Sequence, residues 1–421
     1  MTNLLYFEEY VSELSKRLYC RDDINLIILR AKKTIGKYIS IKELEDTKFQ
    51  YYIFDTDANF DKELLKFKDW LKKNNIILDY FLNDSEYYLD ISNRIAKKIG
   101  LDALDERQIG WVRDKVYMKD KFNEIGLKTV DYMSVDCIED IINFYHKHRD
   151  KTIIFKPRNL MNSIQVYKIE SLEDIYGLDI DFSKNNYMVE DYCSDQEWSI
   201  ESLVQDGKVI DSYVTYIPNR TLWASMSGDL NCHMTVPKIP SYFKFEPKEF
   251  IQRIVTGMNL ENGAMTIEVF IDKNGNIIPS ELGWRLPGCQ ATMNHSISFG
   301  FDMYNALIDI SIHKPVNLKY KDVITSVGDL YLPNKEGIIQ NITSLDELLL
   351  MKGVINGQLF VKIGDYQHKR RTGNDASGWV QVEGISTNDT LAKMQNVYNS
   401  FKIEICEECE RNDAKKYVRK K

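Results

Sequence analysis

Short apolar runs alternate with amphipathic stretches along the first hundred residues of the chain. Residues 24–29 and 49–54 are apolar and β-like, residues 60–74 have helical spacing, and residues 76–82 form a further apolar run. Strands that alternate with helices predict a parallel sheet in an α/β domain. Residues 1–20 carry leucines at helical spacing and predict an amphipathic helix. No glycine fingerprint follows the first strand, which disfavours a dinucleotide site there.

From about residue 114 the pattern changes to strands joined by polar turns. Asp114 and Lys115 open a helix that ends at Gly126, a residue type typical of the position after a helix. After about residue 320 the pattern is β-rich, with one helix over 387–400. Further strands are predicted at 151–157, 164–169, 187–192, 197–204, 209–216, 323–327, 357–363 and 379–384, and helices at 171–177, 246–258 and 300–312.

Two glutamates flank a predicted hairpin. Glu268 lies in an apolar run, residues 273–276 read Lys-Asn-Gly-Asn, and the return strand leads to Glu281. The hairpin can bring the two carboxylates together, where they repel each other unless a cation lies between them. Mg²⁺ is the natural candidate because it prefers oxygen ligands. Arg285, four residues further on, offers a fork of donors for phosphate oxygens.

Composition narrows the class of protein. A chain of 421 residues with 43% hydrophobic residues suggests about two to four globular subdomains. The net charge of −8 argues against a nucleic-acid partner, and no apolar run approaches the length of a membrane span. The first residues lack the features of a signal peptide, and seven scattered cysteines favour a reducing cytoplasm. Cys406 and Cys409 have metal-binding spacing but no second pair.

Charged residues recur where predicted helices and strands begin or end. Two lysines, an arginine and several carboxylates suit a magnesium–nucleoside triphosphate, because the cations neutralise phosphates and the carboxylates hold the metal. No Walker loop and no kinase signature is present. The set is Lys115, Lys156, Glu190, Tyr192, Glu197, Glu268, Glu281 and Arg285.

In this order and spacing the residues resemble the ATP-grasp ligases over roughly residues 75–400, and most closely over 114–290. The resemblance implies an α/β (α+β) fold with an N-terminal parallel α/β domain, a two-lobed ATP-grasp core and a β-rich C-terminal subdomain. The branch it suggests includes bacterial L-amino-acid ligases and biotin-carboxylase-like enzymes. The corresponding segments are 1–113, 114–192 with a lid loop at 158–163, 193–318, and 319–421 with a charged tail.

The resemblance also implies a role for each residue. Lys115 and Lys156 would contact the nucleotide, Glu190 and Tyr192 would belong to the adenine-binding hinge, and Glu197 would bind the ribose. Glu268 and Glu281 would hold Mg²⁺, or Mn²⁺ in its place. Arg285, with Lys156, would act in catalysis by steadying the transferring phosphoryl group and the acyl phosphate.

Two positions depart from the family pattern. Gly283 stands where the family usually carries an asparagine that acts as a third metal ligand. The lid loop, usually glycine-rich, has no glycine here. Asn162 tolerates the left-handed backbone that glycine would supply, and Ser163 keeps a hydroxyl and an N–H for phosphate.

The expected reaction is phosphorylation of a carboxylate by ATP, followed by attack of an amine on the acyl phosphate with release of ADP and phosphate. The expected partners are small-molecule acids and amines, such as amino acids or a small peptide; a homodimer is left open. His233 and His295 lie on segments that could face the acceptor, and Trp223 and Trp284 could wall an apolar pocket. Two alternatives stay open: a ligase that acylates a carrier-protein thiol, and a non-catalytic ATP-binding module.

Overall fold

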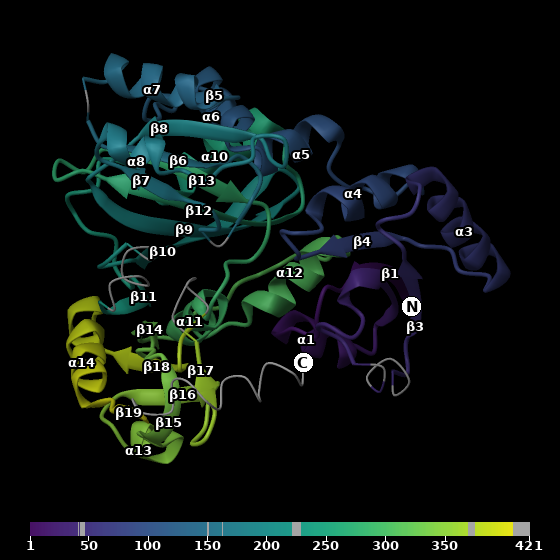
Figure 1. Cartoon of the computed structure of the whole chain (residues 1–421). Coiled ribbons are helices and arrows are strands. Elements are labelled where there is room, and N and C mark those ends of the chain that lie inside the picture. The colour runs from purple at the N-terminus through teal and green to yellow at the C-terminus, as the bar shows by residue number, and fades with distance from the viewer. Residues whose placement is uncertain are drawn as a thin grey trace.

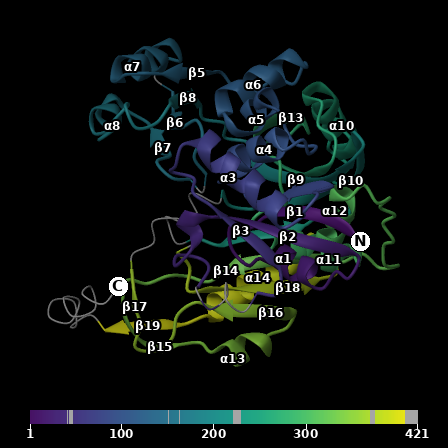
Figure 2. The same ribbon diagram turned by 90° about the vertical axis from the view of Figure 1, so that its right-hand side faces the viewer.

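The computed structural model describes residues 1–40, 42, 47–149, 151–161, 163–220, 229–368 and 375–406. It is a mixed α/β structure with four sheets (Figure 1). Figures 1 and 2 both show the sheet that contains β6 and β8 at one end of the molecule and the sheet that contains β15 and β19 at the other. Within the described residues, no helix is long and apolar enough to cross a membrane.

The N-terminal domain is a four-stranded parallel sheet, as the alternation of strands and helices predicted. Its strand order is β3-β2-β1-β4, so the order reverses between β1 and β4. The strands are β1 (Thr2–Phe7), β2 (Ile24–Ala31), β3 (Gln50–Phe54) and β4 (Tyr80–Asn83). The helices are α1 (Glu13–Tyr19), the short 3₁₀ helix η1 (Lys32–Thr34), α3 (Phe60–Lys73) and α4 (Leu89–Lys98).

The predicted helix over residues 1–20 is wrong in its first half, which forms β1. This strand lies between β2 and β4, and its residues Leu4–Phe7 are all buried. A parallel strand covered on both faces is apolar throughout, so its sequence lacks the alternation that marks most strands. The helix begins only after Ser12, whose hydroxyl accepts the Ser15 backbone N–H at 3.2 Å.

A smaller antiparallel sheet forms one lobe of the central region. Its strand order is β5-β8-β6-β7, with α7 and α8 packed against it and α5 and α6 before it in the chain. Gly126 follows the end of α6 with φ of 77°, as predicted. The elements are α5 (Glu106–Arg113), α6 (Lys115–Glu124), β5 (Tyr132–Val135), α7 (Ile138–Lys147), β6 (Ile153–Pro157), β7 (Tyr167–Ile169), α8 (Leu172–Tyr176) and β8 (Tyr187–Asp191).

The largest sheet has eight strands in the order β13-β12-β9-β10-β11-β14-β18-β16, and all of its pairings are antiparallel. It runs across the predicted boundary between residues 318 and 319, because β11 pairs with β14. The strands are β9 (Gln196–Gln205), β10 (Lys208–Tyr216), β11 (Asn231–Thr235), β12 (Gly263–Ile271), β13 (Ile277–Gly283), β14 (Ser326–Tyr331), β16 (Val354–Leu359) and β18 (Gly378–Gly384).

Helices and a small third antiparallel sheet complete the chain. The small sheet has the order β17-β15-β19, and the charged tail that follows it lies outside the described residues. Helix α10 buries Phe250, Ile254 and Val255 in the core beside β9 and β12. The elements are α10 (Pro247–Met258), α11 (Ala291–Phe299), α12 (Met303–Ser311), β15 (Gly337–Ile342), α13 (Leu345–Leu349), β17 (Tyr366–Gln367), α14 (Thr387–Ser400) and β19 (Ile403–Cys406).

The predicted hairpin joins β12 to β13. Asp272 Oδ1 accepts the backbone N–H groups of Asn274 and Asn276 at 2.8 and 2.9 Å, which closes the turn. Gly275 has φ of 81°, and a Cβ there would lie 1.8 Å from the Tyr242 carbonyl oxygen. The turn therefore needs glycine for its conformation and for the close approach of the neighbouring backbone.

A buried ion pair joins β1 to β2. Glu8 and Arg30 are at most 1% exposed, and the Arg30 Nε–H donates to Glu8 Oε2 at 2.8 Å. Tyr19 adds a hydrogen bond to the other oxygen of Glu8 at 2.5 Å. The carboxylate therefore has partners on β2 and at the end of α1.

Glu8→Ala should destabilise the N-terminal domain by about 3–5 kcal/mol, because it leaves the Arg30 charge buried and unpaired. Glu13→Ala is the matched control: it breaks partly exposed ion pairs to Lys16 and Arg17, worth about 0–1 kcal/mol. Urea unfolding followed by far-UV circular dichroism measures both. Equal shifts for the two variants would contradict the importance of the buried pair.

Candidate active site

A cavity of about 340 Å³ lies between the small antiparallel sheet and the β9–β12–β13 end of the large sheet. It receives side chains from α6, β6 and β8 on one side and from β9, β12 and β13 on the other. The structure thus brings together residues that are far apart in the sequence. The predicted residues that line it are Lys115, Lys156, Ser163, Glu190, Glu197, His233, Glu268, Glu281 and Arg285.

Glu268 and Glu281 lie directly opposite each other on β12 and β13. The Glu268 side chain is accessible from the space of the cavity, and the walls of the cavity surround it. Enclosure and the nearby charges of Glu281 and Glu197 raise the pKa of Glu268 to about 8. Two facing carboxylates with this repulsion fit a divalent cation, which would stabilise both in their charged forms.

Lys115 connects α6 to the glutamate pair. Its Nζ lies 2.8 Å from Glu281 Oε1 and donates a hydrogen bond to the Leu160 carbonyl at 2.7 Å. The side chain is only 7% exposed. A buried cation in this position tethers the helix, the loop after β6 and the candidate metal site to one another.

Glu190 is held between two buried lysines. Its carboxylate lies 2.6 Å from Lys156 Nζ and 2.9 Å from Lys119 Nζ. Burial would raise the pKa of Glu190, but the two lysines lower it to about 2. In this structure Glu190 therefore orients the lysine predicted to bind phosphate. A contact between Glu190 and the adenine amine remains a prediction.

The sequence analysis missed Lys119, which lies one helical turn after Lys115 on α6. It is 1% exposed, and burial lowers its pKa even though Glu190 partly offsets the effect. A lysine four residues after another on a helix usually marks a solvated face. The spacing of Lys115 and Lys119 placed both lysines on one face of the helix. Nothing in the sequence showed that Lys119 has a buried carboxylate partner.

The sequence analysis also missed Glu86, which orients Arg285. Glu86 Oε2 accepts the Arg285 Nε–H at 2.7 Å, and Arg113 lies 2.8 Å from the other oxygen of Glu86. Glu86 comes from the loop after β4, so this contact joins the N-terminal domain to the cavity. Asp84 from the same loop accepts the Leu286 backbone N–H at 2.9 Å.

The two predicted substrate histidines differ in position. His233 lines the cavity, and its Nδ1 lies 3.1 Å from Asp329 Oδ2. Burial would lower the pKa of His233, but Asp329 raises it above its ordinary value. His295 is fully buried and lies within 3.2 Å of Glu201, Thr215 and Thr235, so we assign it to the hydrogen-bonded core.

The other predicted site residues differ in whether they lie at the cavity. Ser163 lines the cavity with φ of 57°, the left-handed conformation that was expected at Asn162. Asn162 and Trp223 lie outside the described residues. Tyr192 is not among the described residues that line the cavity; its ring packs under the Arg220 guanidinium, 4.5 Å away.

Gly283 pairs with Thr266 across the hairpin beside the glutamate pair. A Cβ at Gly283 would lie 3.4 Å from Thr266 Cγ2 and 3.7 Å from Arg285 Cγ, distances compatible with a side chain. Its missing side chain thus leaves two glutamates, rather than two glutamates and an amide, at the candidate metal site.

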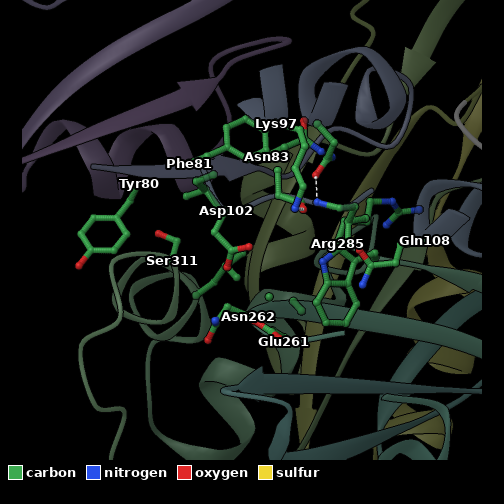
Figure 3. Close-up of a pocket in the computed structure, with 18 of the residues that line it drawn as sticks. Tyr80, Phe81, Asn83, Lys97, Asp102, Gln108, Glu261, Asn262, Arg285 and Ser311 are labelled. Atoms are coloured by element: carbon green, nitrogen blue, oxygen red, sulfur yellow. Dashed lines mark hydrogen bonds between the residues drawn. The ribbon is translucent and has the colours of Figure 1, made fainter. Parts of the chain in front are cut away.

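A second cavity of about 210 Å³ lies between β4 and the start of β12 (Figure 3). Figure 3 shows Asn83, Asp102, Gln108 and Asn262 around it, with Arg285 at one side. Arg285 lines both cavities, whereas Trp284, predicted to wall the acceptor pocket, lines the second one. The second cavity lacks the paired glutamates and the lysines of the first.

Comparison with known proteins is consistent with this geometry. Residues 150–293 match the family model described as ATP-grasp domain. Over these residues the chain is similar to the ATP-grasp domain. The matched segment includes Lys156, Glu190, Glu268, Glu281 and Arg285.

Relatives and solved structures extend the similarity. The chain is 21% identical over 272 residues to the L-arginine-specific L-amino acid ligase of Bacillus subtilis, covering 62% of this chain and 64% of that protein. It is 24% identical over 255 residues to the alanine–anticapsin ligase of Bacillus subtilis strain 168, covering 55% of this chain and 53% of that protein. Each match thus spans less than two thirds of the relative's length.

Two crystal structures resemble the fold over nearly the whole chain. An L-amino acid ligase from Bacillus licheniformis superposes with a TM-score of 0.74 at 14% identity, covering 97% of this chain and 99% of that one. N5-carboxyaminoimidazole ribonucleotide synthetase from Thermotoga maritima gives a TM-score of 0.65 at 14% identity, covering 96% and 100%. The predicted fold class is confirmed.

The affinity of the nucleotide-free protein for Mn²⁺ should rise about tenfold per pH unit up to about pH 8 and then level off. The reason is that the cation must displace the proton of Glu268, whose pKa is about 8. Electron paramagnetic resonance of free Mn²⁺ measures this. Glu281→Gln should weaken binding and shift the dependence to lower pH, since it removes a ligand and the main charge opposing Glu268. A pH-independent affinity below pH 8 would contradict the assignment.

Proposed function

We propose that the protein is an ATP-dependent ligase that activates a carboxylate as an acyl phosphate and joins it to an amine. The observation that carries the proposal is the facing pair Glu268 and Glu281, contacted by Lys115, in a cavity that also holds Lys156 and Arg285. Paired carboxylates beside buried cations suit a magnesium-bound triphosphate.

In the proposed arrangement the nucleotide lies in the cavity with its phosphates toward Lys115 and Lys156. Lys156, fixed by Glu190, supplies positive charge for the phosphates, and the Ser163 hydroxyl and N–H lie on the loop above them. Glu197 lies on β9, at the opposite side of the cavity, and can accept hydrogen bonds from ribose hydroxyls. The base then lies toward the β8 end of the cavity.

Glu268 and Glu281 would hold the magnesium ion, which when bound neutralises phosphate charge and polarises the transferred group. The donor set fits this role because burial and the charges of Glu281 and Glu197 raise the pKa of Glu268, even though Lys156 and Lys115 partly offset the effect. Lys115 compensates part of the negative charge of this site through its ion pair with Glu281.

Transfer of the γ-phosphoryl group makes the acid reactive. The carboxylate oxygen attacks the γ-phosphorus, the bond to the β-phosphate oxygen breaks, and ADP leaves. An amine then attacks the acyl carbon, the bond from carbon to phosphate oxygen breaks, and phosphate leaves as the amine loses a proton. Lys156 and Arg285 would stabilise charge on the transferred group and on the tetrahedral oxyanion.

His233 is suited to a supporting role at the acceptor end of the cavity. Asp329 fixes its Nδ1 side and favours the charged imidazolium. A cationic donor there would stabilise negative charge on the phosphoryl group or the oxyanion. We therefore place His233 with Arg285 around the reacting carboxylate.

The substrates we propose are small amino acids or a short peptide precursor. The names of the similar proteins, an L-arginine-specific L-amino acid ligase and an alanine–anticapsin ligase, support this class. Acylation of a carrier-protein thiol is the second candidate, and its product would be a thioester. The proposed amide-bond formation requires neither a carrier protein nor a dimer.

Glu281→Gln should abolish phosphate release from ATP and Mg²⁺ in a screen over pairs of amino acids, because it removes a metal ligand. Activity should fall at least about 10³-fold, and the wild-type nucleotide product should be ADP. Coupled phosphate detection and chromatography of nucleotides measure both. The matched control Glu249→Gln changes an exposed glutamate on α10 and should leave turnover unchanged.

Three results would redirect the proposal. AMP and pyrophosphate as products would overturn the acyl-phosphate route. Acyl transfer to a phosphopantetheine carrier without turnover of free amines would favour the thioester alternative. Tight ATP binding without phosphate release, with any acid–amine pair, would indicate a non-catalytic module.

Asp329→Asn should lower the pKa of His233. As the pH is raised, activity should therefore be lost at a lower pH in this variant than in the parent protein. The protonated imidazole is the active form in this role, and the raised pKa keeps it protonated over a wider range. The pH dependence of kcat/KM, measured for Asp329→Asn and His233→Gln, tests this. His233→Gln should lose about 10- to 100-fold in kcat/KM and the associated pH limb. An unchanged limb in both variants would remove His233 from the mechanism.

A further inference from the structure

Three metal-ligating side chains converge outside the cavity, at one edge of the small lobe. Asp131 precedes β5, His148 caps the end of α7, and Asp191 ends β8. One ligand atom from each lies within 4.8 Å of the others. None of the three lines the nucleotide cavity. We call Asp131, His148 and Asp191 the Asp–His–Asp cluster.

The ring of His148 is held rigidly in this cluster. Its side chain is 10% exposed and stacks on Phe144, with ring centroids 4.0 Å apart and an interplanar angle of 14°. Its Nδ1 lies 2.8 Å from Asp191 Oδ1. The Asp191 backbone N–H donates to the Asp131 carbonyl at 2.9 Å, which fixes the two aspartates side by side. These contacts fix the His148 ring and the backbone spacing of the two aspartates.

The cluster also leaves buried polar atoms without hydrogen bonds. Two buried side-chain atoms of the cluster, His148 Nε2 and Asp191 Oδ1, have no hydrogen-bond partner in the described part of the chain. The ion-pair contact between Nδ1 and Asp191 is thus close but is not a well-directed hydrogen bond. Buried groups of this kind are usually completed by water, an ion or a ligand, and a cation would complete the Asp191 carboxylate here.

We propose that the Asp–His–Asp cluster binds a divalent transition-metal cation, with Zn²⁺ as the representative ion. One imidazole nitrogen and two carboxylate oxygens, with water in the remaining position, suit the coordination that Zn²⁺ adopts. Mg²⁺ prefers oxygen ligands in an octahedral arrangement and is a poorer match for the imidazole. The site is separate from Glu268 and Glu281 and does not depend on the proposed ligase activity.

Occupancy would clamp three elements of the small lobe together. Asp191 directly follows Glu190, which pairs with Lys156 in the cavity and with the buried Lys119 behind it. A cation at the cluster therefore ties β5 and α7 to the strand that positions the phosphate-binding lysine. Its expected effect is greater thermal stability of this lobe.

The test is Zn²⁺ binding by equilibrium dialysis in excess Mg²⁺, using the full chain with Cys406 and Cys409 both changed to Ser. One equivalent of Zn²⁺ should bind per chain, and Asp131→Asn or Asp191→Asn should weaken binding at least about tenfold. Asp179→Asn, an exposed aspartate of the same lobe, and Glu281→Gln should both leave it unchanged.

Co²⁺ provides an independent spectroscopic readout. Its visible absorption should report nitrogen and oxygen ligands, and the bands should disappear in Asp131→Asn. This variant changes an exposed side chain, so its melting temperature without metal should match that of the parent protein. Zn²⁺ should raise the melting temperature of the parent but not that of the variant.

Several outcomes would overturn the proposal. They are no Zn²⁺ bound in excess Mg²⁺, equal binding by Asp131→Asn, Asp191→Asn and the parent, or loss of binding in Glu281→Gln alone. The last result would assign the metal to the nucleotide cavity. Phosphate release is not a readout of this test, so a failure here leaves the proposed function standing.

Discussion

The repulsion between Glu268 and Glu281 is the constraint around which the cavity is arranged. Two carboxylates placed opposite each other across a hairpin cannot both be ionised cheaply in an enclosed space. Lys115 relieves part of this cost from α6, which belongs to the other side of the cavity. The excess negative charge therefore attracts Lys115, and this attraction holds the two sides of the cavity together. The same negative charge favours binding of a metal cation between the two glutamates.

The same principle of paired buried charge extends outward from the hairpin. Glu190 has two lysine partners, and Glu86 has two arginine partners. In each case one carboxylate joins separate elements: β8 to α6 and β6, and the loop after β4 to α5 and Arg285. Removing either carboxylate would leave two cations close together in a poorly solvated space, which is far more costly than losing a surface pair.

Local signals in the sequence predicted the elements well and the contacts between them poorly. The hairpin, the parallel N-terminal sheet and most strands of the core follow from apolar periodicity and turn residues. Strand β1 was missed because burial on both faces removes the alternation that identifies a strand. Periodicity records which face is buried, but it does not record which element covers that face.

The partners of the site residues could not be predicted for a related reason. Arg285 and Glu86 are 199 residues apart in the sequence, and His233 and Asp329 are 96 apart. His233 and His295 looked equivalent in the sequence, and each has a carboxylate partner, yet only His233 lines the cavity. Residue type and spacing predict that a charge will need a partner. The three-dimensional arrangement decides which partner it finds and whether the group faces a ligand.

Gly283 has a consequence for how a metal would be held. The backbone there leaves room for a side chain, and the neighbouring Thr266 and Arg285 would not exclude a small one. With two carboxylate ligands from the protein, most of the metal's coordination must come from phosphate oxygens and water. The metal and the triphosphate are then expected to enter as one complex. In that case Lys115 and Lys156 supply the early attraction, and the glutamates fix the position of the metal once it has arrived.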